Sequence, residues 1–253
     1  MIAGPSVFRV SPAYQPLMRM IGLDAEAVFD RPDIRVWRKL PDRENCTLDV
    51  DLPDGRHIRL HIKRYVSADA ATPEVQGQRL LTDHAIPTAP LVGWGTHTGK
   101  SFTIFDDLTS YTPADKLLEA GTPFDLLLDP TAALAAKLHA SGLHHRDLYL
   151  CHFMTKLDDG IVDLKLIDTA RVRNLPGFLT RRRWIVKDIA QFIYSTHAHP
   201  INDAQRSAWF AAYARHGGTS GIEAAAARKV RSIARHDARI NTRRPERNVS
   251  IPS

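Results

Sequence analysis

The feature that most limits how this chain can fold is a change in hydrophobic periodicity near Asp106-Asp107. Before this point, short apolar or alternating runs predict strands at 35–40, 46–52, 57–65, 91–94 and 102–105. After it, apolar residues recur every three or four positions and predict helices at 124–141, 181–196, 203–215 and from about 222. We therefore expect an α+β fold with a sheet-rich lobe at 1–108 and a mainly helical lobe at 109–253.

The first lobe should hold a five-stranded, mainly antiparallel sheet and one prominent helix. Asp54-Gly55 lies between two alternating runs, which is typical of a β-hairpin. The prominent helix should begin with Thr72 as its N-cap, followed by Pro73 in the first turn, and end near His84. An earlier helix is expected at 12–29 from the spacing of its apolar residues.

Two aspartates carry the clearest chemical signal. Asp147 follows His145-Arg146 in a loop after a helix, and Asp168 ends a short apolar run about twenty residues later. Phosphoryl transfer uses such a pair, because one carboxylate accepts the proton of the substrate hydroxyl while the other holds the metal that bridges the phosphates. The sequence therefore predicts Asp147 as the catalytic base and Asp168 as a metal ligand.

The candidate nucleotide-binding residues precede these aspartates. Lys63 ends a strand and Glu74 lies on the next helix, and kinases use such a lysine on the phosphates and such a glutamate to hold it. Taken singly, each is ordinary: an exposed strand cation and a first-turn acid favoured by the helix dipole. Their order along the chain favours the kinase interpretation. ATP is then expected between the lobes, with adenine against the backbone around Asp106 and Leu108.

The stretch from His144 to Leu175 contains the pattern H-R-D-x-Y-x-x-H-F, followed by I-D-x-x-R. It resembles the catalytic core of the lipopolysaccharide core kinases, the Kdo/heptose kinase family of the protein-kinase-like superfamily. The matching positions are His145, Arg146, Asp147, Tyr149, His152, Phe153, Ile167, Asp168 and Arg171. The likeness extends to Ile62–Tyr65, to Ala85–Thr88, which is similar to the family's G-[IV]-P-T, and to Asp188. Asp188 resembles the aspartate that braces the catalytic loop from a buried helix.

This resemblance implies a protein-kinase-like two-lobed fold, with ATP and Mg²⁺ as cofactors. It implies transfer of the γ-phosphate to a heptose or Kdo hydroxyl, with the lipopolysaccharide core or a related phosphorylated glycan as the partner. His152 stands where protein kinases have a metal-binding asparagine, so it is a second candidate metal ligand. Imidazole suits Mg²⁺ less well than oxygen donors do, so weak ligation, ligation through water and a structural role all stay open.

Three further positions depart from ordinary protein kinases. No G-x-G-x-x-G precedes Lys63, so the turn at 41–45 would have to cover the phosphates without glycines. His61 stands two residues before Lys63, where a small residue usually faces adenine. Tyr149 replaces the lysine that steadies the γ-phosphate. The departures at His152 and Tyr149 are shared with the lipopolysaccharide kinases and therefore favour that family.

The net charge of +6 is concentrated near the C-terminus. Between Arg228 and Arg247, eight Lys or Arg residues stand against Asp237 and Glu246, and Arg181–Arg183 form a smaller cluster. A localised basic face attracts phosphorylated glycans, anionic lipid headgroups or nucleic acid; the alternative is a solvated helix face. With the family resemblance, we expect peripheral contact with an anionic membrane surface and no nucleic-acid partner.

The lack of a recognisable targeting signal and the pattern of cysteines both favour a cytoplasmic protein. The N-terminal residues lack a basic region followed by an apolar run, and no apolar stretch is long enough to span a bilayer. Cys46 and Cys151 lie far apart and outside any C-x-x-C context, so the disulfide framework of a small secreted domain is absent, while a single disulfide stays open. We expect the protein on the inner face of the cytoplasmic membrane.

Two other functions would use the same fold: a non-catalytic pseudokinase or regulatory binding protein, and a kinase acting on protein or a small metabolite. Intact Lys63, Glu74, Asp147 and Asp168 favour an active enzyme, because a pseudokinase commonly lacks one of these groups. Trp184 is interpreted as a core anchor rather than a ligand-stacking residue.

Overall fold

The computed structural model describes residues 6–243, with only the backbone for 241–243. The described chain divides into two compact units. Unit 1 holds residues 6–76 and 89–107, and unit 2 holds residues 77–88 and 108–243. Helix α3 (Thr72–Asp83) contributes its first residues to unit 1 and the rest to unit 2. The lobe boundary at 108 and the functions assigned to the lobes stay predictions.

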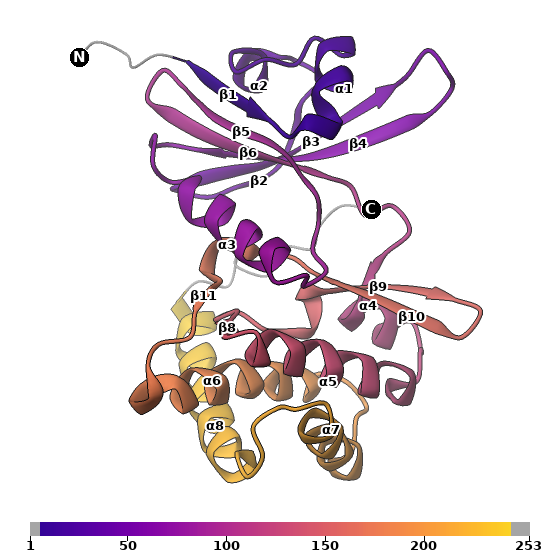
Figure 1. Cartoon of the computed structure of the whole chain (residues 1–253), viewed down its shortest axis with the longest axis vertical. Helices are drawn as coiled ribbons and strands as arrows, with labels where there is room; N and C mark the ends of the chain where they lie inside the picture. The colour runs from indigo at the N-terminus through magenta and orange to yellow at the C-terminus, as the bar shows by residue number, and fades with distance from the viewer. Residues whose placement is uncertain (1–5, 244–253) are drawn as a thin grey trace. The chain divides into compact units, whose positions relative to one another are not determined.

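Unit 1 is built on a six-stranded antiparallel sheet (Figure 1). In spatial order its strands are β1 (Val7–Val10), β5 (Leu91–His97), β6 (Lys100–Asp106), β4 (His57–Tyr65), β3 (Arg43–Asp51) and β2 (Arg35–Lys39). The prediction of five strands was wrong, because β1 adds an edge by pairing with β5 from Val7↔Thr96 to Val10↔Gly93. A four-residue strand is too short for a periodicity signal to reveal.

Alternation along β4 determines which side chains enter the core of unit 1. Leu60 and Ile62 are almost fully buried and pack with residues of α1 (Gln15–Met20) and α2 (Ala27–Asp30). The single helix expected at 12–29 was therefore wrong. Gly22 interrupts it with φ +61°, a left-handed conformation that glycine adopts without strain. The carboxylate of Asp24 then accepts the backbone N–H of Ala27 at 2.8 Å and starts α2.

The connection between β2 and β3 is shorter than the sequence suggested. Residues 43–45, expected within a phosphate-covering turn at 41–45, belong to β3 and pair with β4 from Arg43↔Tyr65 to Asn45↔Lys63. Only residues 40–42 link the two strands, and the N–H of Leu40 donates to the carbonyl of Arg43 at 2.8 Å. Any contact of this hairpin with phosphate would therefore come from a tight turn without glycine.

Unit 2 is mainly helical. Its helices beyond α3 are α4 (Ala114–Glu119), α5 (Phe124–Ala140), α6 (Phe178–Thr196), α7 (Asp203–Arg215) and α8 (Glu223–Arg243). The predicted helices are confirmed within a few residues at their ends, while α4 was not predicted. Short strands lie between them: β7 (Thr112–Pro113), β8 (Leu143–His144), β9 (Phe153–Asp158), β10 (Ile161–Leu166) and β11 (Arg173–Asn174). None of the helices in residues 6–243 combines the length and apolar character needed to cross a bilayer.

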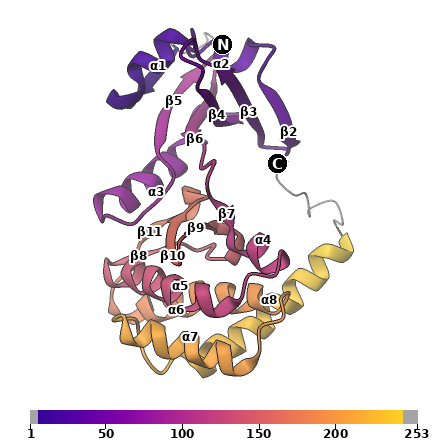
Figure 2. The ribbon, with the colours of Figure 1, turned by 90° about the vertical axis from the view of Figure 1, so that its right-hand side faces the viewer.

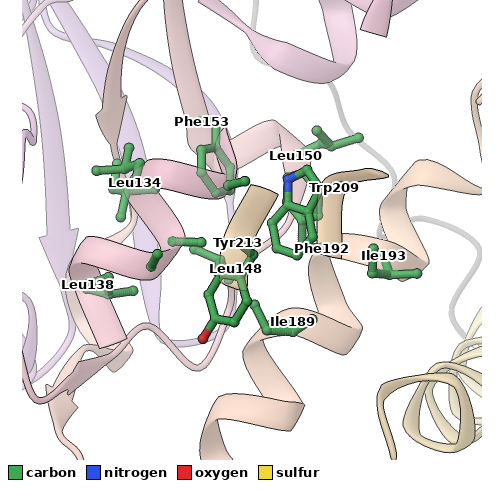
Figure 3. Packing of buried hydrophobic residues seen from close by; sticks show 14 of the residues in the cluster. Leu134, Leu138, Leu148, Leu150, Phe153, Ile189, Phe192, Ile193, Trp209 and Tyr213 are labelled. Carbon is green, nitrogen blue, oxygen red and sulfur yellow. The ribbon is translucent and has the colours of Figure 1, made fainter. Parts of the chain in front are cut away.

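The core of unit 2 centres on Trp209 (Figure 3). Its ring stacks on Phe192 at 4.4 Å and on Tyr213 at 5.6 Å between ring centroids, and its Nε1 donates to Thr131 Oγ1 at 3.0 Å. Leu148 and Leu150 are fully buried in the same cluster. The loop that carries Asp147 is thus anchored by side chains that are part of the core.

Candidate functional site

Lys63 and Glu74 form an ion pair within unit 1. Lys63 follows Ile62 on β4, so its side chain lies on the opposite face of the sheet from the buried apolar side chains. The Glu74 side chain is 2% exposed, whereas that of Lys63 is 23% exposed. The expected approach of these residues is confirmed, and their role with a nucleotide stays a prediction.

Two residues that the sequence did not single out also hold Glu74. The Tyr65 hydroxyl donates to the Glu74 carboxylate, and Thr103 Oγ1 donates to its Oε2 at 3.4 Å. Burial, followed by the negative charge of Glu74, raises the pKa of Tyr65, so this phenol stays a donor. The strand register could have indicated both residues. Tyr65 lies on the same face of β4 as Lys63, and Thr103 is the partner of Lys63 on β6.

The proposed adenine-binding backbone is partly engaged within its own unit. The N–H of Asp106 donates to the Pro90 carbonyl at 3.0 Å, and the Tyr14 hydroxyl donates to Asp106 Oδ2 at 2.7 Å. The backbone N–H of Asp106 is therefore already engaged within unit 1. Leu108, the first residue of the second part of unit 2, accepts the N–H of Tyr111 at 2.7 Å. His61, the residue expected to face adenine, is also engaged within unit 1, because its Nε2 is hydrogen-bonded to Asp107 Oδ1 at 2.5 Å.

The loop before Asp147 is fixed by one buried carboxylate. Asp188, on α6, accepts the backbone N–H of His145 at 2.6 Å and that of Arg146 at 2.8 Å. Burial opposes ionisation of Asp188, but His139 and the loop amides outweigh it and lower the pKa. Arg146 has φ +68°, an uncommon conformation for a side chain of this size. The bracing position that the resemblance assigns to Asp188 is therefore observed directly.

Asp147 projects from this loop with 21% of its side chain exposed. Its Oδ1 lies 3.4 Å from Gln191 Nε2 and 3.6 Å from Arg171 Nη1. Gln191 is buried on α6, while the Arg171 side chain is about half exposed. The carboxylate is thus oriented from the core side by an amide and faces a guanidinium on the open side.

Asp147, His152 and Asp168 bring possible ligand atoms within 4.8 Å of one another, the only such group that includes three His, Cys, Asp or Glu residues among those described. Asp168 has φ +60°, so its backbone adopts the left-handed region that side chains rarely occupy. The Nδ1 of His152 lies 2.6 Å from the carbonyl of Asp147, and its Nε2 lies 3.8 Å from Asp168 Oδ2. Two carboxylates and one imidazole fit a divalent cation.

The ring of His152 has two roles that exclude each other. With Nδ1–H bonded to the Asp147 carbonyl, a neutral ring leaves the Nε2 lone pair for a metal beside Asp168. As an imidazolium it instead pairs with Asp168. Burial would lower the pKa of His152, but Cys151, Asp168 and the Asp147 carbonyl outweigh it and raise the pKa to about 10. The raised pKa favours the imidazolium form, which would pair with Asp168.

The segment carrying Asp168 rests on residues 77–88. Leu166 accepts a hydrogen bond from Thr88 Oγ1 at 2.7 Å and donates its N–H to the Pro87 carbonyl at 2.8 Å. Ala85, where the family pattern has glycine, has φ +51°. At Gly77, an added Cβ would lie 1.9 Å from the Thr169 carbonyl oxygen. Nothing in the sequence indicated that this helix glycine lies against the loop that carries Asp168.

Trp184 is not the core anchor that we expected. Its side chain is only partly buried, and it contacts basic residues around the catalytic loop. The Arg146 guanidinium lies 4.8 Å from the indole centroid, and the His144 ring centroid lies 4.8 Å from it. Lys187 Nζ lies 5.5 Å from the same ring and 3.1 Å from the Arg146 carbonyl. Trp184 therefore holds the Arg146 side chain through a cation–π contact.

Comparison with known proteins finds a family that matches the region containing Asp147, His152 and Asp168. The sequence model of the lipopolysaccharide kinase (Kdo/WaaP) family matches residues 101–213. Over this part of the chain, the protein is similar to the lipopolysaccharide kinase (Kdo/WaaP) family. The matched segment contains Asp147, His152, Asp168 and Asp188, so the cluster and its brace both lie within the family's shared region.

Two relatives in this family are lipopolysaccharide core heptose(I) kinases named WaaP. The chain is 28% identical over 218 residues to the one from Escherichia coli strain K12, covering 74% of this chain and 80% of that protein. It is 25% identical over 189 residues to the one from Pseudomonas aeruginosa strain PAO1, covering 64% and 69%. The crystal structure of an aminoglycoside-3'-phosphotransferase of type VIII superposes with a TM-score of 0.53 and 16% identity, covering 79% of this chain and 93% of that chain. The α+β, protein-kinase-like fold class is thereby confirmed.

Proposed function

We propose that this protein is a Kdo/WaaP-type, ATP-dependent kinase that phosphorylates a heptose or Kdo hydroxyl of the lipopolysaccharide inner core. The observation that carries the proposal is the placement of Asp147, His152 and Asp168 in one cluster, beside a loop whose amides are held by Asp188. The WaaP names of the relatives support the acceptor class.

Asp147 would act as the general base. Its partly exposed carboxylate would accept the proton of the acceptor hydroxyl while that oxygen attacks the γ-phosphorus and ADP leaves. The Gln191 amide keeps the carboxylate oriented. The neighbouring Arg171 guanidinium suits an acceptor that carries negative charge, as a phosphorylated or acidic sugar does.

Asp168 and His152 would hold the metal, which we propose to be Mg²⁺. Bound there, the ion supplies charge neutralisation to the β- and γ-phosphates. Lys63, oriented by Glu74, Tyr65 and Thr103, would contact the α- and β-phosphates, and the backbone of Asp106 and Leu108 would meet adenine.

The test is phosphate transfer from ATP to purified, dephosphorylated core oligosaccharide. Asp147→Asn should lower turnover by about 10²–10⁴-fold with nearly unchanged nucleotide affinity, because only the basic carboxylate is lost. Asp168→Asn should also weaken Mg²⁺-dependent nucleotide binding. Asp159→Asn, at the exposed β9–β10 turn, is a matched control and should change neither quantity.

Two results would contradict parts of this proposal. A wild-type protein that binds ATP but phosphorylates no glycan, protein or small molecule is a pseudokinase. Transfer to a protein or a metabolite in place of the glycan would retain the catalytic assignment and overturn the acceptor. His152→Asn separates the two roles of the ring, since an amide preserves Mg²⁺-dependent activity if His152 is a ligand and lowers stability if the role is structural.

We also propose that α8, the yellow helix of the ribbon in Figure 2, presents a basic face to an anionic partner. Residues spaced by three or four positions share one face of a helix. The exposed face carries Arg228, Arg231, Arg235 and Arg239, while Ile222, Ala226, Val230 and Ile233 lie against the core. Arg244 and Arg247, part of the predicted basic segment, lie outside the described residues. Peripheral attachment at the cytoplasmic face of the inner membrane would bring this helix near anionic lipid.

A further inference from the structure

The most exposed large apolar side chains among the described residues are two neighbours at the start of α6. Phe178 is 92% exposed and Leu179 is 94% exposed, well above Ile161 at 71%. Single exposed apolar residues are common on protein surfaces. Two adjacent apolar side chains that are almost fully exposed form a small apolar patch. Such a patch is typical of a site that binds another protein or a membrane.

A fixed group of cations follows this apolar pair. Arg181, Arg182 and Arg183 are all exposed. Arg181 Nη2 donates to the His139 carbonyl at 3.1 Å, and Arg182 Nη2 donates to the Gly221 carbonyl at 2.7 Å. These bonds hold two of the guanidinium groups against the body of unit 2. The stretch 173–187 contains no acidic residue, so the chain on either side of the pair carries a single sign of charge.

We propose that Phe178 and Leu179 insert into the interface of an anionic lipid bilayer while Arg181–Arg183 contact the headgroup phosphates. Aromatic and aliphatic side chains next to Arg or Lys are the combination that binds the boundary between headgroups and acyl chains. A row of arginines matches headgroup phosphates in charge and geometry. An apolar groove of a protein partner would satisfy the two apolar side chains but not the three exposed arginines that follow them.

The contrast with Ile161 supports this choice. Ile161 is also a strongly exposed apolar residue, at the turn between β9 and β10. Its neighbours on the β9–β10 hairpin include Asp158, Asp159 and Asp163 beside Lys156, so the local charge is net negative and an anionic surface would repel it. Ile161 therefore serves as a control: it is an exposed apolar side chain on the same unit, with net negative charge beside it.

The test is flotation of the full-length protein with vesicles of phosphatidylcholine mixed with phosphatidylglycerol. The double variant Phe178→Ser/Leu179→Ser should bind these vesicles at least about tenfold more weakly, because two apolar side chains no longer leave water. Ile161→Ser should bind as the wild type does. Arg183→Gln should weaken binding about fivefold at low salt, and the difference should shrink as salt is raised.

Three results would overturn the proposal. The first is unchanged vesicle binding by the double serine variant while circular dichroism shows an intact fold. The second is equal binding of the wild type to vesicles of phosphatidylcholine alone. The third is unchanged vesicle binding with a raised KM for the oligosaccharide acceptor, which would place the pair in an acceptor-binding surface instead. Vesicle binding needs no catalysis, so it can succeed or fail independently of the proposed kinase function.

Discussion

Gly77→Ala directly tests the close packing of α3 against the loop that carries Asp168. The added Cβ would lie 1.9 Å from the Thr169 carbonyl oxygen, 2.9 Å from its carbon and 3.2 Å from Val172 Cβ. Ordinary contact begins near 3.4 Å, so α3 and this loop must separate by about 1.5 Å. The obstacle is backbone, which cannot rotate away as a side chain can.

Two opposing terms determine the expected stability of this variant. Alanine in place of a helix glycine should stabilise α3 by about 1 kcal/mol. Overpacking against backbone costs about 1–3 kcal/mol, and more where relaxation is blocked. We expect a net loss of about 1–2 kcal/mol in the free energy of unfolding. Turnover should fall further, by up to about 10²-fold, because a displacement of about 1 Å at a catalytic group has that effect.

Urea unfolding and phosphate transfer should be measured on the same preparations of this variant. Gln76→Ala, at the exposed neighbouring position, is the control and should stay within about 0.5 kcal/mol of the wild type. A Gly77→Ala protein that is more stable by about 1 kcal/mol and fully active would show that helix propensity alone operates at this position. The close approach to Thr169 would then be wrong.

Three more substitutions test separate contacts. Tyr65→Phe should cost about 1–2 kcal/mol in urea unfolding and lower turnover, because buried Glu74 loses a donor; an unchanged protein would show that Lys63 and Thr103 suffice to hold Glu74. Ala85→Gly should raise the free energy of unfolding by about 0.5–1 kcal/mol, since glycine accepts φ +51° without strain; a lower melting temperature would contradict this. Burial, as the main cause, lowers the pKa of His144 to about 4. The unfolded chain, with a pKa near 6.5, therefore takes up a proton first as pH falls, and the wild type should lose about 1–2 kcal/mol at pH 5 relative to His144→Gln. Equal pH dependence of the two proteins would exclude that role.

The sequence predicted the parts of the fold that depend on local pattern. Periodicity indicated α5, α6 and α7 to within a few residues, because each buries one face along its whole length. It failed for 12–29, where Gly22 and the Asp24 cap interrupt an otherwise helical spacing. It also missed β1, whose identity depends on a hydrogen-bonded partner far along the chain.

The candidate site divides in a similar way. Asp147, Asp168, Lys63 and Glu74 could be predicted because their residue types and order follow the chemistry of phosphoryl transfer. Their supports could not be, since Gly77 and Trp184 are ordinary residues whose roles arise from contacts made by the folded chain. The sequence predicts Trp184 as a core residue, since large aromatic side chains are mostly buried. In the structure its ring instead contacts the Arg146 guanidinium of the catalytic loop.

The bond between Asp188 and the catalytic loop has a consequence for recognising distant relatives of this protein. Asp188 binds main-chain N–H groups, which every residue except proline provides, rather than the side chains of His145 and Arg146. Selection on this contact therefore conserves the aspartate. It places little constraint on which residue types stand at positions 145 and 146. A divergent homologue could lose the H-R-D motif and keep the same loop conformation. The buried aspartate on the downstream helix should therefore be conserved over greater evolutionary distances than the motif.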